Sequence, residues 1–318
     1  MDLHVVPARH APQVLCMRGH ALRRYNLLMT SHVLPLRHFL LALGIVAIWG
    51  SNFVIIKLGL THLPPLLFAA LRFACAAFPM VFFLPRPAAS WRNLAAYGMF
   101  IGVGQFGLLF LAMQGHISPG LASLVVQMQV FFTIFLAMRI THERVKPVQW
   151  MALALAAAGI AVIAAHTDGS TTIGGLAMIL LAALSWSCGN MVVKRAGKVN
   201  MVAYVVWTSL FSVPPLFALS LMFEGWPAIV TGLREADAIS WAAVFWQATA
   251  NVMFGYAAWG WLLARHPAAT VTPMALLVPV FGMATSSWWL GESLPAWKLV
   301  AMALVMGGLA INLLRRPG

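Results

Sequence analysis

Charged residues are scarce in this chain: they make up 8% of its 318 residues, whereas hydrophobic residues make up 62%. A soluble domain usually carries about a quarter charged residues. A soluble core of this size could not bury so much apolar surface, so we expect lipid to surround most of the chain. The scarcity of charge therefore excludes an ordinary soluble domain and predicts a membrane protein.

Cysteine is also rare, because the sequence holds only Cys16, Cys75 and Cys188. This number excludes a network of disulfides, and Cys75 and Cys188 lie inside apolar runs, where we interpret them as small packing residues. The sequence has no CxxC pair and no Cys/His spacing typical of a metal site. We therefore expect neither a metal ion nor a cofactor.

Signatures of catalysis are missing as well. All ten histidines lie in the N-terminal arm or in predicted loops, whereas a membrane-embedded enzyme needs a His/Asp or metal constellation near the bilayer. The sequence contains no HExxH, GxSxG or Walker motif and no paired carboxylates within the apolar runs. We predict that the protein is not an enzyme and does not use ATP directly; a membrane-embedded enzyme is the rival class.

Long apolar runs dominate what is present. A helix that crosses a bilayer needs roughly 20 apolar residues, and ten such runs occur, at 39–59, 63–84, 94–113, 119–138, 148–165, 174–193, 201–222, 240–263, 270–290 and 296–314. None alternates apolar and polar residues as barrel strands do. The sequence predicts an all-α membrane protein with ten transmembrane helices.

The basic residues indicate the orientation. The net charge of +13 does not come from one patch, so we exclude a nucleic-acid partner. If the N-terminus is cytoplasmic, sixteen of the twenty Lys and Arg residues lie in the arm, the cytoplasmic loops and the tail. This bias follows the positive-inside rule and predicts that both termini are cytoplasmic.

One short phrase occurs twice. Trp49 and Lys57 stand eight residues apart, and so do Trp186 and Lys194, with an Asn close behind each Trp. Two further pairs, Glu143 with Glu292 and Gly159 with Gly308, share an offset of 149 residues. Two related halves are typical of transporters built from repeats. Because each half holds five predicted helices, an odd number, the halves must be inverted.

The predicted organisation has three parts. Residues 1–36 form a basic cytoplasmic extension that we expect to be disordered, unless the true start is Met29. Residues 37–166 form the first five-helix repeat, and residues 172–315 form the second.

Several stretches carry a family resemblance: WGSNFVIIKLGLTHLPPLLFAALRFACAAFPMVFF, GLASLVVQMQVFFTI, ALSWSCGNMVVKRAG, and LLVPVFG followed by LGESL. They resemble the EamA family of the drug/metabolite transporter superfamily, most of all its O-acetylserine/cysteine exporter branch. One departure is His142-Glu143, where a Gly-Glu pair is more usual.

The resemblance implies two EamA repeats, a place in the inner (plasma) membrane and export of a small metabolite, with amino acids such as cysteine or O-acetylserine as expected cargo. The inverted repeat favours alternating access. A broad exporter of drugs or amphipathic compounds, or a passive channel, is the alternative. The sequence leaves the substrate, the driving force and the oligomeric state open.

Polar residues within the runs are the candidates for a substrate path, since polar groups in lipid usually face a cavity or a neighbouring helix. Arg72 is the most informative, because a guanidinium can bind a carboxylate in a bidentate manner. It could equally serve as a structural hydrogen-bonding post. The other candidate cavity residues are Trp49, Asn52, Gln105, Gln127, Trp186, Asn190, Gln247, Asn251, Tyr256 and Trp259.

A second set has either a gating or a structural role. Lys57 and Lys194 either snorkel at helix ends or gate the two mouths. Glu143 and Glu292 precede helices, where a carboxylate suits the positive helix end, which we favour over a role in proton coupling. Pro273 and Pro279 interrupt the ninth run, and provide either a hinge or a fixed bend.

Overall fold

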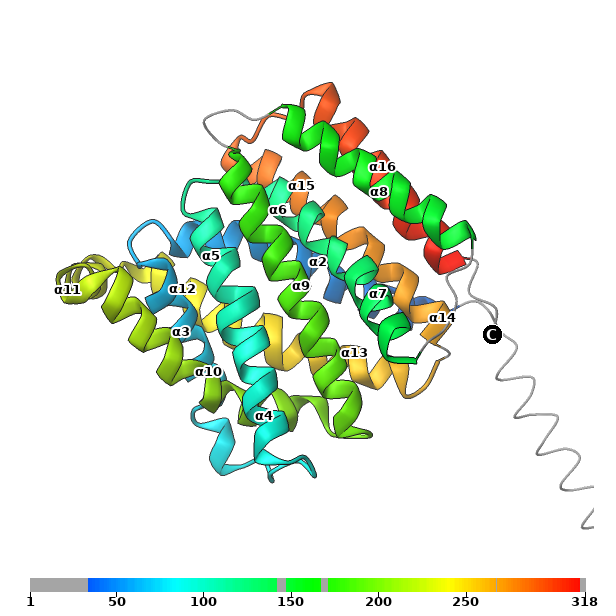
Figure 1. Cartoon of the computed structure of the whole chain (residues 1–318). Coiled ribbons are helices and arrows are strands. Elements are labelled where there is room, and N and C mark those ends of the chain that lie inside the picture. The colour runs from blue at the N-terminus through cyan, green and yellow to red at the C-terminus, as the bar shows by residue number, and fades with distance from the viewer. Residues whose placement is uncertain (1–33, 142–146, 167–170, 267, 315–318) are drawn as a thin grey trace, which may run out of the picture.

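The computed structural model describes residues 34–141, 147–166, 171–266 and 268–314, and helices account for most of these residues (Figure 1). The predicted all-α fold is confirmed. Most of the N-terminal arm and Glu143 lie outside the described residues.

The helices in the first half of the chain are α2 (Leu36–Gly59), α3 (Pro65–Ala77), η1 (Met80–Phe82), α4 (Trp91–Gly98), η2 (Met99–Gly107), α5 (Leu108–Met113), α6 (Pro119–Val125), η3 (Val126–Met128), α7 (Gln129–Thr141) and α8 (Pro147–Ala165). Those in the second half are α9 (Ile173–Ala196), α10 (Met201–Phe223), α11 (Gly225–Glu235), α12 (Ala238–Trp246), η4 (Gln247–Phe254), α13 (Gly255–Leu263), α14 (Ala268–Val271), η5 (Thr272–Leu276), α15 (Leu277–Leu290) and α16 (Ala296–Leu314).

Apart from α11, the described helices overlap the ten predicted ranges. By length and apolarity, eight of them could cross a membrane, and Ala296–Asn312 is a shorter apolar helix. A multi-pass membrane protein is therefore confirmed. Ten crossings, the inverted repeat and its boundaries stay predictions.

Some boundaries differ from the prediction. The second run was expected to be helical over 63–84, but α3 ends at Ala77 because Phe78, which precedes Pro79, is extended. The ninth run is divided into α14, the 3₁₀ segment η5 and α15, with Pro273 in η5 and Pro279 in the first turn of α15. The loop between the seventh and eighth runs contains a helix, α11, that the sequence analysis missed.

Two of the helical segments, η2 and η4, are π-helical and interrupt the third and eighth runs. A π-helical turn leaves backbone carbonyls for other donors, and it often marks a functional position. Neighbouring helices supply these donors: Ser212 Oγ donates to Gly98 O, Ser185 Oγ to Phe100 O, and Trp49 Nε1 to Asn251 O. Both segments are thus fixed by side chains from elsewhere in the chain.

Hydrogen bonds between residues far apart in the sequence show which helix ends lie together, and these ends form two opposite faces of the molecule. One face joins Leu66 to Glu224, Ser118 to Glu292, His62 to Ser240 and His116 to Thr172. The other face joins His38 to His266, Asn93 to Tyr204 and Leu84 to Trp207.

We call the first face the acidic end, because it holds the described carboxylates Glu224, Glu235, Asp237 and Glu292. We call the second the basic end, because it holds Arg37, Arg86, Arg92, Lys194, Arg195, Lys198 and Arg265. The positive-inside rule predicts that the basic end faces the cytoplasm. His38, expected to lie outside the helices, is in the first turn of α2.

The helices α8 and α16 pair along one side of the molecule (Figure 1). Their glycines, which match at the offset of 149 residues, both lie in this interface. A Cβ at Gly159 would stand 3.0 Å from Ala301 O, and a Cβ at Gly308 would stand 2.4 Å from Ala152 O. Small residues at these positions allow the two backbones to approach closely.

Candidate functional site

Arg72 lies on α3 in the interior, with 1% of its surface exposed. Its guanidinium carbon is 3.7 Å from the centroid of the Phe106 ring and 4.7 Å from that of Phe73. Nε and Nη1 have no hydrogen-bond partner among the described residues. The aromatic rings therefore stabilise the cation through their faces and leave N–H groups unused.

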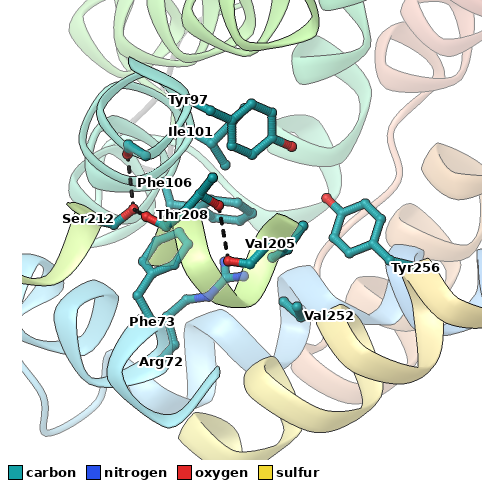
Figure 2. A pocket seen from close by; sticks show the side chains of 11 residues that line it. Arg72, Phe73, Tyr97, Ile101, Phe106, Val205, Thr208, Ser212, Val252 and Tyr256 are labelled. Carbon is teal, nitrogen blue, oxygen red and sulfur yellow. Dashed lines mark hydrogen bonds between the residues drawn. The ribbon is translucent and has the colours of Figure 1, made fainter. Parts of the chain in front are cut away.

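A small cavity adjoins the guanidinium. Tyr97, Thr208, Ser212 and Tyr256 contribute its hydroxyl groups, and the hydroxyl ends of Tyr97 and Tyr256 point toward one another (Figure 2). Thr208 Oγ1 donates to Val205 O at 3.0 Å, and Ser212 Oγ donates to Gly98 O at 3.0 Å. The space is on the order of one water molecule, so the described conformation closes tightly around Arg72.

Two further predicted cavity residues resemble Arg72, because they too are buried and have polar atoms without a hydrogen-bond partner in the described part of the chain. Asn52 on α2 and Gln247 in η4 are buried, and Asn52 Oδ1 and both amide atoms of Gln247 lack a partner within the described part of the chain. The segment η4 packs against both α2 and α3. An unpaired buried polar group costs about 1–3 kcal/mol, so these helices carry polar groups that a polar ligand could satisfy.

An aromatic cluster adjoins η4. The Trp49 ring lies 6.0 Å from the Tyr256 ring and 5.1 Å from the Trp259 ring, between centroids. Trp49 Nε1 donates to Asn251 O at 3.2 Å. The structure therefore brings together four of the predicted cavity residues from α2, η4 and α13.

Asn190 belongs to a different group. Its Nδ2 donates to Gln129 Oε1 at 3.1 Å and to Thr133 Oγ1 at 3.2 Å. The bonds tie α9 to α7, which supports the helix-bridging interpretation of Asn190 over pore lining. Gln127, the glutamine of this run that was predicted to line the cavity, is buried in η3 and is not a partner of Asn190 in these bonds.

The remaining predicted cavity residues, Gln105 and Trp186, differ in burial, since Trp186 is only partly buried. Gln105 is buried in η2, and Trp186 on α9 packs against the main hydrophobic core.

Glu292 joins the two halves at the acidic end. Its carboxylate accepts hydrogen bonds from Lys298 Nζ at 2.8 Å, Gly120 N at 3.1 Å, and the hydroxyls of Ser118 and Ser286. Burial alone would raise the pKa of this carboxyl, but the bonds from Lys298, Ser118 and Ser286 outweigh burial and lower it. Glu292 therefore caps α6 in the first half, whereas the sequence analysis expected it to cap the adjacent α16.

Glu224 makes a similar contact. Its carboxylate accepts from Leu66 N at 2.6 Å, Leu67 N at 3.2 Å and Ser220 Oγ at 2.5 Å. Two carboxylates of the second half thus cap two helix N-termini of the first half, where the helix dipole favours negative charge.

The two repeated lysines differ in surroundings. Lys57 Nζ donates to Met113 O at 3.4 Å at the acidic end, whereas Lys194 is exposed at the basic end. In the described residues, no three His, Cys, Asp or Glu side chains lie close enough to hold a metal ion.

Sequence reasoning missed three residues that line the cavity beside Arg72: Tyr97, Thr208 and Ser212. The spacing of Thr208 and Ser212, four residues apart on one helix face, was an available signal. No local signal links either residue to Arg72, because that proximity arises from packing between α3 and α10.

The EamA-like transporter family matches residues 36–165 and again residues 173–314. A Salmonella typhimurium LT2 protein named "Probable amino-acid metabolite efflux pump" is 40% identical over 278 residues, covering 86% of this chain and 93% of that protein. An Escherichia coli K12 protein of the same name is 37% identical with the same coverage.

A Streptantibioticus cattleyicolor protein named "Probable terminal-alkyne amino-acid exporter" is 26% identical over 277 residues, covering 84% of this chain and 90% of that protein. One solved structure superposes with a TM-score of 0.59 at 17% identity, covering 89% of this chain and 99% of its own, so the two chains share a fold.

Proposed function

The chain belongs to the EamA-like transporter family, and we propose that it exports small amino-acid metabolites, of the cysteine and O-acetylserine type, across the inner membrane. The names of its relatives support this cargo class, since two are called amino-acid metabolite efflux pumps and a third an amino-acid exporter. In this proposal the cargo crosses without chemical conversion.

The observation that carries the proposal is the unpaired guanidinium of Arg72 in the interior. An amino acid brings a carboxylate, whose oxygens can accept charge-assisted hydrogen bonds from a guanidinium that has unused N–H groups. Tyr256 beside it, and Asn52 and Gln247 on adjoining helices, are the further proposed cargo contacts. Gln105, Asn251, Trp49 and Trp259 complete the proposed wall.

Access to Arg72 requires movement. The cavity beside the guanidinium is too small for an amino acid, so cargo can reach it only if α3, η2, α10 and η4 separate at one end. We propose that residues 37–166 and 172–315 are inverted five-helix units that tilt against each other. The carboxylate caps of Glu224 and Glu292 would then hold the acidic end closed.

Proteoliposomes test the proposal. Vesicles would be loaded with labelled cysteine, O-acetylserine and a panel of other amino acids, and efflux followed with and without a pH gradient. Saturable efflux of unchanged cargo, verified by mass, is expected from the unmodified protein and should be lost in Arg72→Ala. The matched control is Arg86→Ala, since Arg86 stacks on Trp91 at 4.6 Å, outside the cavity.

The results separate the candidate functions. Efflux of no amino acid, combined with efflux of amphipathic compounds, would replace the amino-acid exporter with a drug exporter. Equal efflux by Arg72→Ala and the unmodified protein would return Arg72 to a structural role. A chemically altered product would contradict transport without conversion.

A further inference from the structure

A second cavity opens at the basic end, between the first turn of α4 and the last turns of α9. Its volume is about 480 Å³, and its lining includes Ser90, Arg92, Asn93, Val192 and Arg195. Arg92 lies in the first segment that matches the family, and Arg195 lies in the second. The cavity therefore lies across the junction between the two halves.

The floor of this cavity is held by hydrogen bonds. Asn93 Nδ2 donates to Val192 O at 2.8 Å, and Tyr204 OH donates to Asn93 Oδ1 at 2.6 Å. Ser90 Oγ accepts from Asn93 N at 3.2 Å. These bonds fix α4 against α9 and α10, and they already use the side-chain amide of Asn93. The groups of the lining that can bind a charged ligand are therefore the guanidinium groups of Arg92 and Arg195.

The charge of the cavity selects an anion. No carboxylate of the described residues lies within 4.0 Å of Arg92 or Arg195, and the described carboxylates lie at the acidic end. Cysteine and O-acetylserine carry no net charge at neutral pH, whereas the phosphodiester of a phospholipid is permanently anionic. The field of two unneutralised arginines therefore favours a phosphate over the proposed cargo.

The surroundings place the cavity at head-group depth. Phe82 is 77% exposed, Phe83 74% and Trp91 50%, and the Arg86 guanidinium lies 4.6 Å from the Trp91 ring centroid. Exposed aromatic rings beside arginines are typical of the membrane interface. Acyl chains of a bound lipid could lie against the two phenylalanines while its head group reaches the arginines.

We propose that this cavity binds the phosphate of an anionic phospholipid, with Arg92 and Arg195 contacting it from the two halves. Basic pockets between helices on the cytoplasmic side suit such head groups. A phosphate bound by both arginines neutralises positive charge from both halves and so stabilises the packing of α4 against α9.

Native mass spectrometry of the full chain in detergent tests the proposal. Phosphatidylglycerol and phosphatidylcholine would be titrated separately, on the unmodified protein, Arg92→Gln, Arg195→Gln and the double variant. Affinity for phosphatidylglycerol should fall about fivefold for each arginine, the equivalent of about 1 kcal/mol per basic residue near a membrane surface. Arg86→Gln and Lys198→Gln, outside the cavity lining, should change it less than twofold.

Three results would overturn the proposal. The first is full retention of phosphatidylglycerol by the double variant, provided that it elutes as a folded monodisperse protein. The second is equal affinity for phosphatidylcholine in the unmodified protein. The third is displacement of phosphatidylglycerol by an equimolar amount of inorganic phosphate, which would identify a free anion as the ligand.

Discussion

Lys298 Nζ lies 2.8 Å from Glu292 Oε1, and the side chains of both residues are almost fully buried, at 4% and 9% exposure. The carboxylate also caps α6 through Gly120 N and Ser118 Oγ. The ion pair thus fixes the turn before α16 to α16 itself, and the bonds from Gly120 and Ser118 join this turn to the first half of the chain. Together with the bond from Ser286, these contacts give each carboxylate oxygen of Glu292 two hydrogen-bond donors. A proton carrier would have to break such bonds each time it takes up a proton, which favours a structural role for Glu292.

Glu292→Gln should destabilise the protein by about 3 kcal/mol at pH 7, since it leaves the buried Lys298 without a counter-charge. The hydrogen bonds lower the pKa of Glu292 in the folded state below its ordinary value of about 4.5. The stabilisation is therefore complete above pH 4.5 and is lost as the pH falls through the folded pKa.

Thermal unfolding in detergent between about pH 2 and pH 8 would measure this effect, because the folded pKa lies below 4.5. The matched control is Glu235→Gln, which removes an exposed carboxylate at the same end. A loss of stability for Glu292→Gln that is the same at every pH would contradict the ionic account.

Gly308→Ala should destabilise the pairing of α8 and α16, because its Cβ would stand 2.4 Å from the backbone oxygen of Ala152. Overpacking of this kind costs about 1–3 kcal/mol. The neighbouring Gly307→Ala is the control, since a Cβ there meets nothing within 4 Å. Melting temperatures in detergent compare the two, and equal values would show that α8 and α16 do not pack this closely.

Asn190 and Gln129 should be energetically coupled, because Asn190 Nδ2 donates to Gln129 Oε1 at 3.1 Å. A double-mutant cycle with alanine at both positions should give a coupling of about 1 kcal/mol, near the range found for hydrogen bonds between membrane helices. The same cycle with Gln127 should be additive. Coupling of Asn190 to Gln127 instead would reverse the assignment of these two glutamines.

The apolar runs predicted where the helices lie because crossing a bilayer imposes a length that any chain must meet. The interruptions were less predictable. The π-helical segments η2 and η4 depend on donors such as Ser185 and Trp49, which come from other helices. The helix α11 lies in a loop of mixed polarity, where no long apolar run indicates it.

In the candidate site, too, some features could be predicted from the sequence and others depend on packing between helices. The low charge of the chain made Arg72 conspicuous, and its burial agrees with that emphasis. Its setting between Phe73 and Phe106 could not be predicted, because the two rings belong to different helices. Likewise, the helix that Glu292 caps is 172 residues away along the sequence, and only the packing of the two halves identifies it.

The central claim, that Arg72 binds the carboxylate of the cargo, is tested most directly with a pair of substrates. Cysteine and cysteamine differ by the carboxylate, and their kcat/KM values in proteoliposomes give a discrimination ratio. The account predicts that the unmodified protein favours cysteine and that Arg72→Lys, which loses the bidentate geometry, reduces this ratio at least about tenfold, equivalent to about 1.4 kcal/mol. An unchanged ratio in a folded Arg72→Lys variant, even with slower transport of both compounds, would contradict it.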